Sequence, residues 1–364
     1  MPDVLHLAGP VRVGDDDVRP EAWVVGGRIT YERPSSGDVT RVPGWVVPGL
    51  VDVHCHIGLV ATGPADRAAA QAQALADRDS GVLLVRDAGS PSDTRWIDER
   101  DDLPRLIRAG AHLARPKRYL RGYGIELDDV ADLPDEVRRQ AERGDGWVKI
   151  VADWIDREAG AEADLAPLWP ADVLGDAVAR AHDAGARVTA HTFSTVALDP
   201  LLDAGVDCLE HGTGLTAQQI DRVARTGVAV TPTLLQVAQF GAIAGQADGK
   251  YPVYAGHMRQ MHARRYEHVR DLFDAGVRLL VGTDAGGTLS HGRIADECAE
   301  LARAGVPALD VLGAASWRTR EYLGVPGLVE GASADLVVYD ADPARDVRAL
   351  TTPSAVVLRG SRVA

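Results

Sequence analysis

The stretch VVPGLVDVHCHIG, residues 46–58, marks the point where the chain changes its pattern. Before it, residues 4–47 form short extended segments separated by turn residues, and the pair Gly26-Gly27 is typical of a hairpin turn. After it, short apolar segments alternate with alanine-rich stretches of helical spacing, which is typical of βα units around a parallel sheet. The stretch therefore separates a small β unit from a larger α/β body.

Eight strand candidates follow in the α/β body. They are residues 49–54, 81–87, 118–124, 146–153, 186–191, 206–211, 227–233 and 278–284. The stretches between them, such as 64–81 and 170–186, have helical apolar spacing and end near glycine, and two further helices are expected in 293–305 and 307–324. Eight alternations predict a (β/α)8 TIM barrel over residues 49–327, an α/β fold.

Both chain ends are rich in β-type sequence. Near the C-terminus, SADLVVYDADP (333–343) and SAVVLRGSRVA (354–364) return to the extended pattern of the first residues. Neither end has enough apolar residues to form a stable sheet alone. We therefore expect residues 1–48 and 328–364 to form one composite, sandwich-like β domain.

Composition excludes several classes of partner. The chain has 364 residues, with 39 Lys and Arg against 53 Asp and Glu, and its formal charge is −14. The arginines are scattered, so no basic face for nucleic acid is expected. The first residues resemble no signal peptide, and no run of 18 apolar residues occurs, so we expect a cytoplasmic protein that binds no membrane. The sequence leaves the oligomeric state open, a homo-oligomer included.

Three cysteines, Cys55, Cys208 and Cys298, form no CxxC pair. They give neither a disulfide framework nor a zinc-thiolate site. We expect three reduced thiols.

Four of the eleven histidines lie at the carboxyl ends of predicted strands: His54, His56, His191 and His211. That edge of a barrel is where catalytic groups gather. An HxH pair also occurs by chance on exposed strands, and a single buried histidine is often bonded to a backbone carbonyl. Four on one face favour a metal site over that interpretation. Asp284 ends the eighth predicted strand before Ala-Gly-Gly, so its carboxylate is expected at the same mouth.

Lys149 interrupts the apolar strand WVKIV, where an unpaired ammonium is costly to bury. One interpretation is that it reaches solvent or pairs with an acid such as Asp153 or Asp87. The other is that its amine has a lowered pKa and reacts with carbon dioxide, giving a carbamate that bridges two metal ions.

Taken together, these segments resemble the amidohydrolase superfamily of metal-dependent hydrolases. The matching pieces are VVPGLVDVHCHIG, GVLLVRDAGS, WVKIVAD, RVTAHTF, GVDCLEHGTG, LVGTDAG and EGASADLVVYDADP, in family order from about residue 24 to 364. Within the superfamily the sequence is most similar to imidazolonepropionase-like proteins, including the binuclear Xaa-Pro dipeptidases. The lysine on the fourth strand favours the binuclear group.

The resemblance implies a hydrolase acting on carbon–nitrogen bonds with two divalent ions, zinc first, with manganese, cobalt or iron also open. A hydroxide shared by the ions attacks an amide carbonyl, and Asp284 acts as the general base and acid. The implied ligands are His54, His56 and Asp284 for the more buried ion, His191 and His211 for the second, and carbamylated Lys149 for both.

Two other functions remain open at this point. One is a mononuclear cyclic-amide hydrolase or deaminase in which Lys149 is only structural. The other is a non-catalytic relative that binds a metal or ligand without turnover. The number of ions per chain distinguishes the mononuclear enzyme from the binuclear one. Turnover of a panel of amides distinguishes either enzyme from the non-catalytic relative.

The expected substrate is a small molecule, such as a dipeptide, an N-acyl amino acid or a cyclic amide. After the fifth strand the dipeptidases usually have a Tyr or His that grips a carboxyl group, whereas this chain has apolar Phe193. Residues 235–268 are expected to form a long loop and a candidate substrate lid. Other candidates for the substrate pocket are Tyr123, Trp154, His291 and Arg293.

Overall fold

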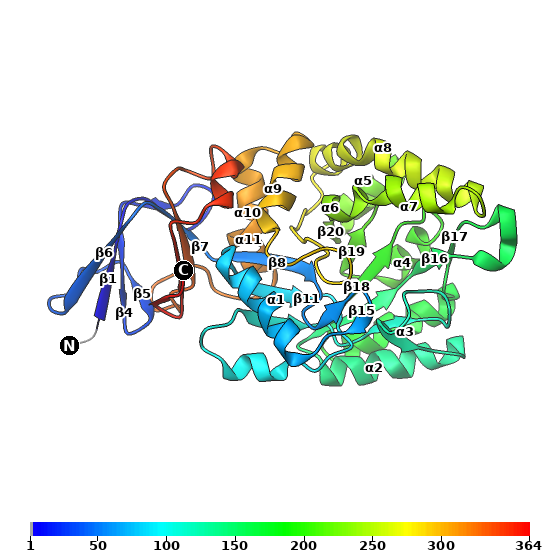
Figure 1. Ribbon diagram of the computed structural model, residues 1–364, viewed down its shortest axis with the longest axis horizontal. Helices are drawn as coiled ribbons and strands as arrows, with labels where there is room; N and C mark the ends of the chain where they lie inside the picture. Colours follow the sequence, from blue (N-terminus) through cyan, green and yellow to red (C-terminus); the bar gives the residue numbers. More distant parts are fainter. Residues whose placement is uncertain (1–2) are drawn as a thin grey trace.

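Short apolar segments after Pro48 form the parallel strands at the centre of the molecule in a computed structural model that describes residues 3–364 (Figure 1). Their side chains are almost all buried, as expected for parallel strands covered by helices. In chain order they are β8 (Leu50–Cys55), β11 (Val82–Asp87), β12 (Arg105–Arg108), β13 (His112–Ala114), β15 (Trp147–Val151), β18 (Arg187–Thr192), β19 (Cys208–His211) and β20 (Ala229–Thr231).

Parallel pairings join these strands in chain order within two sheets, which meet between β12 and β13. β8 pairs with β11, β11 with β12, β13 with β15, β15 with β18, β18 with β19, and β19 with β20. Residues 278–285 connect the last strand back to the first, because Leu279 bridges Val230 and Ala285 bridges Cys55. The order is TIM-barrel-like, with β12 and β13 together in the third position.

The predicted third strand, residues 118–124, is wrong. These residues form turns up to the start of β14 (Gly124–Glu126), while β12 and β13 take the third position. The interruption between β12 and β13 includes Gly110, whose φ of +75° is one that side-chain-bearing residues rarely adopt. A Cβ there would lie 2.5 Å from Oε1 of Gln140. This break leaves two short pieces that no apolar pattern distinguishes.

Helices cover the strands, with α2 and α3 along one side of the body and α5, α7 and α8 along another (Figure 1). The helices expected in 64–81, 170–186 and 293–305 are confirmed as α1, α3 and α9, and 307–324 holds α10 and α11. The bounds are α1 (Arg67–Asp79), α2 (Leu133–Arg143), α3 (Ala171–Asp183), α4 (Leu198–Ala204), α5 (Ala217–Thr226), α9 (Ile294–Arg303), α10 (Ala308–Ala315) and α11 (Trp317–Tyr322).

The long loop expected over residues 235–268 is wrong. That segment is helical and consists of α6 (Leu234–Val237), α7 (Phe240–Ala247) and α8 (Pro252–Asp274). Phe240, Ala255 and Met258 are fully buried between these helices and the body. The segment is therefore a packed part of the helical layer.

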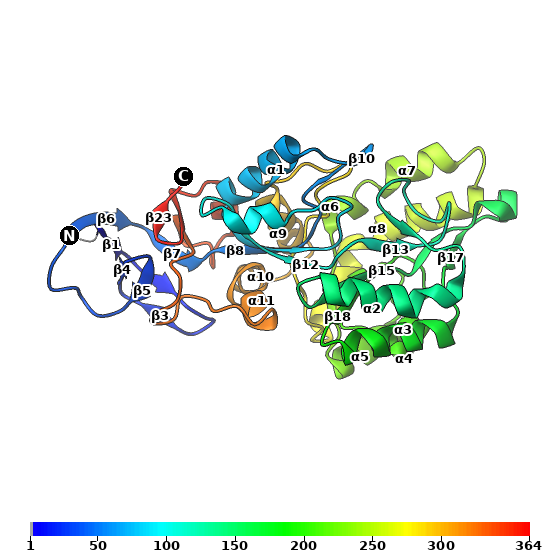
Figure 2. The ribbon, with the colours of Figure 1, turned by 90° about the horizontal axis from the view of Figure 1, so that it is seen from below.

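Strands from both chain ends lie together at one end of the long axis (Figure 2). One sheet has the order β5-β4-β1-β6 and another the order β23-β22-β21-β7-β2-β3. β7 pairs antiparallel with β21, which joins the two ends directly. The bounds are β1 (Asp3–Ala8), β2 (Val11–Arg12), β3 (Val18–Arg19), β4 (Ala22–Val25), β5 (Arg28–Thr30), β6 (Asp38–Pro43), β7 (Trp45–Pro48), β21 (Leu336–Tyr339), β22 (Ala355–Leu358) and β23 (Ser361–Arg362).

The predicted hairpin turn at Gly26-Gly27 is confirmed. It joins β4 to β5, and both glycines have positive φ, +56° and +78°, which a tight two-residue hairpin turn requires. Short strands outside these sheets are β9 (Leu59–Val60), β10 (Gly63–Pro64), β16 (Asp153–Ile155) and β17 (Leu165–Pro167).

Within residues 3–364, no helix has both the length and the apolar character needed to cross a bilayer. Cys55, Cys208 and Cys298 are all buried, and in this part of the chain they form no disulfide.

Candidate metal centre

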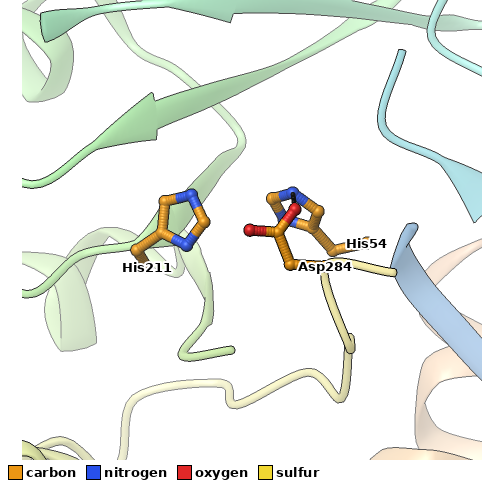
Figure 3. Close-up of side chains that lie close together, drawn as sticks. All are labelled: His54, His211 and Asp284. Carbon is orange, nitrogen blue, oxygen red and sulfur yellow. Dashed lines mark ion pairs between the residues drawn. The ribbon is translucent and has the colours of Figure 1, made fainter. Parts of the chain in front are cut away.

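The strand ends bring the predicted metal ligands together at the carboxyl edge of the parallel strands. His54 comes from β8, His211 from the end of β19, and Asp284 from the segment that connects back to β8. Figure 3 shows these three side chains pointing toward one another. Their ligand atoms all lie within 4.8 Å of one another. The sequence-predicted convergence is thus present in the structure.

The carboxylate of Asp284 is the point at which the first two histidines meet. Its Oδ1 atom lies 3.1 Å from Nε2 of His54 and 3.1 Å from Nε2 of His56. His191 joins through His211, because Nδ1 of His191 lies 3.0 Å from Nε2 of His211. All four histidines and the aspartate therefore form one cluster, which we call the mouth cluster.

Backbone strain aims two of these side chains. His211 and Asp284 have φ of +65° and +57°, in the left-handed region that non-glycine residues rarely occupy. Thr233 shares this feature with φ of +47°, and its hydroxyl lies 2.6 Å from Nδ1 of His211. Such strain costs about 1–3 kcal/mol per residue and gathers at functional sites. The fold maintains it in three residues at or beside the mouth cluster.

Burial favours the neutral imidazole in three histidines of the cluster, His54, His191 and His211. It lowers the pKa of His54 and His191 well below the usual 6.5, and it lowers that of His211 to about 3. Burial alone would raise the pKa of Asp284, but charge interaction with His54 and hydrogen bonds from the nearby histidines bring it well below its usual value. Neutral imidazoles beside an ionised carboxylate are the protonation states that bind divalent metal.

The unpaired atoms of the cluster fit such an ion. His54 Nδ1 and His191 Nε2 are buried and have no hydrogen-bond partner among residues 3–364. Leaving a buried polar atom unpaired costs about 1–3 kcal/mol. Imidazole nitrogen and carboxylate oxygen are donors that zinc and other divalent metals accept. The donor set is therefore suited to a divalent cation.

Lys149 is fully buried in β15 and pairs with Glu210 of β19. The alternative pairing with Asp87 or Asp153 is wrong, because Asp87 accepts backbone N–H groups and Asp153 accepts the Thr192 hydroxyl. Burial lowers the pKa of Lys149 to about 7. A neutral amine, the form that reacts with carbon dioxide, is therefore accessible near neutral pH.

Glu210 is a residue that sequence reasoning missed. Its Oε1 accepts the hydroxyl of Thr189 at 2.7 Å, and its Oε2 lies 3.8 Å from the unpaired Nδ1 of His54. The signal was available, because a glutamate next to His211 interrupts an apolar strand as Lys149 does. Glu210 thus connects the buried lysine to a histidine of the cluster.

His112 was also missed. It is fully buried in β13, its ring lies 4.9 Å from that of His56, and its Nδ1 lies 3.1 Å from the carbonyl oxygen of Tyr123. Its Nε2 is buried without a partner in the described part of the chain. The misplaced third strand concealed it, because residue 112 was not assigned to a strand end.

The five candidate pocket residues divide into two groups. Three lie close to the cluster: the rings of Phe193 and Trp154 are 4.4 and 5.6 Å from that of His191, and Tyr123 is packed beside His112. For His291 and Arg293 a role in the pocket stays a prediction.

His291 and Arg293 are engaged with other side chains. His291 is buried against Asp77 of α1, with Nδ1 2.8 Å from a carboxylate oxygen, and Arg293 pairs with Asp296 of α9 at 2.7 Å. Both belong to the segment that leads into α9, so the chain after the mouth carries them into the helical layer.

Comparisons with known proteins agree with this architecture. The sequence model of the amidohydrolase family matches residues 45–363. An uncharacterized protein of Mycobacterium tuberculosis (strain H37Rv) is 52% identical over 345 residues, which cover 95% of this chain and 92% of that protein. A 5-methylthioadenosine/S-adenosylhomocysteine deaminase of Natronomonas pharaonis is 28% identical, covering 87% of this chain and 78% of the deaminase.

A solved structure gives the same fold. The crystal structure of a Xaa-Pro dipeptidase with bound methionine has a TM-score of 0.81 and is 21% identical, with 100% of this chain and 99% of that chain covered. This likeness shows a TIM-barrel-like α/β fold. With the family match over most of the chain, the expected resemblance is confirmed, and the protein is a hydrolase acting on carbon–nitrogen bonds. The chain belongs to the amidohydrolase family.

Proposed function

We propose that this amidohydrolase cleaves the carbon–nitrogen bond of a small amide, such as a dipeptide, an N-acyl amino acid or a cyclic amide. The observation that carries this proposal is the mouth cluster, in which buried histidines surround one ionised carboxylate. That combination has little value for stability and is suited to metal-assisted hydrolysis. The similar dipeptidase and deaminase both act on small molecules with carbon–nitrogen bonds, which supports the same class here.

The donor set supports a site for two divalent ions, and zinc is the metal that we expect first. When bound, such ions polarise a carbonyl group and lower the pKa of water. The residues that would hold them are His54, His56 and Asp284 for one ion and His191 and His211 for the other, with carbamylated Lys149 between them. The carbamate forms when the neutral amine of Lys149 bonds to the carbon of carbon dioxide and releases one proton to water. Its pairing with Glu210 ends at that step.

Asp284 moves the proton of the reaction. Its carboxylate is ionised and is held at Oδ1 by Nε2 of His54 and of His56. It accepts a proton from the attacking water and delivers it to the leaving nitrogen, which otherwise departs as an unstable anion. The rings of Trp154 and Phe193 lie 5.6 and 4.4 Å from that of His191 and give this part of the site an aromatic wall.

Metal counting tests the two-ion form directly. Wild-type protein purified with zinc and bicarbonate is expected to hold two ions per chain, to show one carbamate signal by carbon-13 NMR, and to hydrolyse some member of a panel of amides, lactones and dipeptides. Lys149→Ala should lose one ion, the carbamate signal and most activity. A small carboxylic acid that fills the gap should partly restore the second ion and the activity. Lys250→Ala is the matched control, because Lys250 is exposed. Two ions and full turnover in Lys149→Ala would contradict the bridging role.

A second candidate is a one-ion cyclic-amide hydrolase or deaminase. The ion pair between Lys149 and Glu210 favours it, because a lysine held by a buried carboxylate can be purely structural. In that case wild-type protein holds one ion, and no carbamate signal is seen. A protein that binds metal and turns over no amide, lactone or amine of the panel would instead be a non-catalytic relative.

We also propose that residues 1–48 and 328–364 form one composite β domain and residues 49–327 a closed (β/α)8 barrel. The pairing of β7 with β21 and the bridges of residues 278–285 support this division. Limited proteolysis should cut at the connections between the two parts, and both terminal fragments should stay associated after cleavage.

A further inference from the structure

A cleft of about 730 Å³ lies between α5 and α8 and extends to the mouth cluster. That volume is typical of sites for small organic molecules. Its wall includes His211 and Phe193. The ring of Phe193 lies 4.7 Å from that of His211, so these two side chains mark where the cleft meets the cluster.

Two contacts fix the cleft beside the segment that carries His211. The hydroxyl of Thr213 donates to Sδ of Met261 at 3.1 Å, and Nε2 of His268 lies 2.9 Å from the carbonyl oxygen of Gly212. Met261 and His268 are two turns apart on α8. The helix residues between them therefore lie at the level of the cluster.

Two arginines of that interval line the cleft, Arg264 and Arg265. Nε of Arg264 lies 3.7 Å from a carboxylate oxygen of Glu267 at the surface. Arg265 donates from Nη1 to the carbonyl oxygen of His262 in its own helix, and its buried Nε has no partner among residues 3–364. A partly buried guanidinium without a carboxylate is a strong site for an anion, because it can form two parallel hydrogen bonds.

The acidic residues that line the cleft leave the guanidinium of Arg265 available to a ligand. Asp164 pairs with His257 at 2.7 Å, and Asp274 pairs with Arg270 at 2.5 Å. Asp271 lies six residues beyond Arg265, which is about 9 Å further along α8. Asp221 lies in the second turn of α5. Among residues 3–364, no carboxylate of the cleft forms an ion pair with Arg265.

Apolar side chains complete that end of the cleft. Phe193, Leu234, Val237 and Met261 all line it, and Phe193 and Met261 pack with Val237 in one group. A ligand that fits must therefore combine an apolar body with a negative charge.

We propose that this cleft binds a carboxylate-bearing molecule with an apolar or aromatic body, with Arg265 holding the carboxylate. Because the cleft opens on His211 and Phe193, it accommodates the end of the substrate that is remote from the bond being broken. This assignment to the substrate rests on the proposed function. The existence of the cleft as a carboxylate site does not, so binding is measured without metal.

The test uses metal-free protein, with N-benzoylglycine as the probe and N-methylbenzamide as its uncharged counterpart. The chain contains three methionines, of which Met261 lines the cleft and Met258 is buried behind it. With carbon-13 methyl labels, N-benzoylglycine is expected to shift the Met261 signal in a saturable way and to leave that of Met258 nearly unchanged. The uncharged amide should bind at least about tenfold more weakly, because it lacks the charged hydrogen-bond acceptor.

Substitutions of Arg265 test whether its guanidinium binds the carboxylate of the probe. Arg265→Met should weaken binding of N-benzoylglycine about tenfold or more, and Arg265→Lys should retain part of it. Arg303→Met is the matched control, since the guanidinium groups of Arg265 and Arg303 both lie over the ring of Tyr266, whereas Arg303 does not line the cleft. A Met261 signal that does not respond to millimolar N-benzoylglycine, or equal affinity in wild type and Arg265→Met, would overturn the proposal. Loss of turnover in metal-loaded protein would bear on the proposed function and leave this result intact.

Discussion

The mouth cluster and the sheet formed by the two chain ends both contain deeply buried side chains, yet these side chains have opposite chemistry. In the sheet, Val46, Leu336 and Val357 are completely inaccessible and apolar. At the mouth, His54 and Lys149 are almost as inaccessible and polar. Burying apolar groups stabilises a fold, whereas burying polar groups without full pairing destabilises it. This difference distinguishes the sheet, which stabilises the fold, from the mouth, which is suited to chemistry.

The largest expected effect comes from Asp284→Asn. Asparagine tolerates the positive φ at this position and keeps the shape, but it cannot accept the proton. We expect kcat to fall about 10³-fold while the melting temperature stays the same or rises. Asp296→Asn, at the surface of α9, is the control. Activity within tenfold of wild type, measured with the amide found in the panel, would show that another group moves the proton.

The sheet should give the reverse result. Leu336→Ala removes a buried side chain of β21 opposite Pro48 and is expected to lower the free energy of unfolding by about 3 kcal/mol. The kcat of the protein that remains folded should not change. Urea denaturation followed by circular dichroism measures the first quantity, with exposed Val329→Ala as the comparison. A loss of kcat without a loss of stability would break the contrast between the two regions.

Glu210→Gln sharpens the contrast inside the mouth itself. The carboxylate lies 3.8 Å from Nδ1 of His54, so it can orient that ring for an ion once Lys149 no longer holds it. Partners of this kind change metal affinity by about 10- to 100-fold. Competition with a coloured chelator should therefore show weaker zinc binding, whereas Glu142→Gln on the surface of α2 should bind zinc as wild type does. Unchanged affinity would assign Glu210 to holding Lys149 alone.

The smallest expected effect is a pH dependence near the ion pair of His291 and Asp77. Burial alone would lower the pKa of His291, but Asp77 raises it above the usual 6.5. A raised folded-state pKa contributes stability that is complete below pH 6.5 and is lost as the pH rises through the raised value. His291→Gln should remove about 1 kcal/mol at pH 6 and flatten the dependence of the unfolding free energy above pH 6.5. If wild type and variant show parallel pH curves, the pair is neutral in the folded protein.

Much of the architecture could be predicted from sequence because apolar runs and glycine stops report buried strands and helix ends directly. β8, β11, β15, β18 and β19 fall where the pattern predicted them. The third strand could not be predicted from sequence, because the positive φ at Gly110 divides it into pieces of four and three residues. α8 was missed because charged side chains occur at almost every turn, which hides its buried stripe.

The candidate site was predictable to the extent that strand ends converge. His54, His56, His191, His211 and Asp284 each follow an apolar segment, and barrel topology alone brings such positions together. Glu210 and His112 act from within strands, and only the packing of neighbouring strands reveals them. The roles of His291 and Arg293 depended on the path of the chain after the mouth, which no local pattern encodes.

The antiparallel pairing of β7 with β21 has a consequence for how the protein is made. Residues 45–48 leave the ribosome almost 290 residues before their partners, residues 336–339. The edge of β7 that pairs with β21 therefore stays unpaired through most of translation. Contacts of such high sequence separation slow folding, and exposed strand edges associate with other chains. Cellular yield should therefore depend on chaperones that shield a nascent N-terminal segment, more than on the intrinsic stability of the finished molecule.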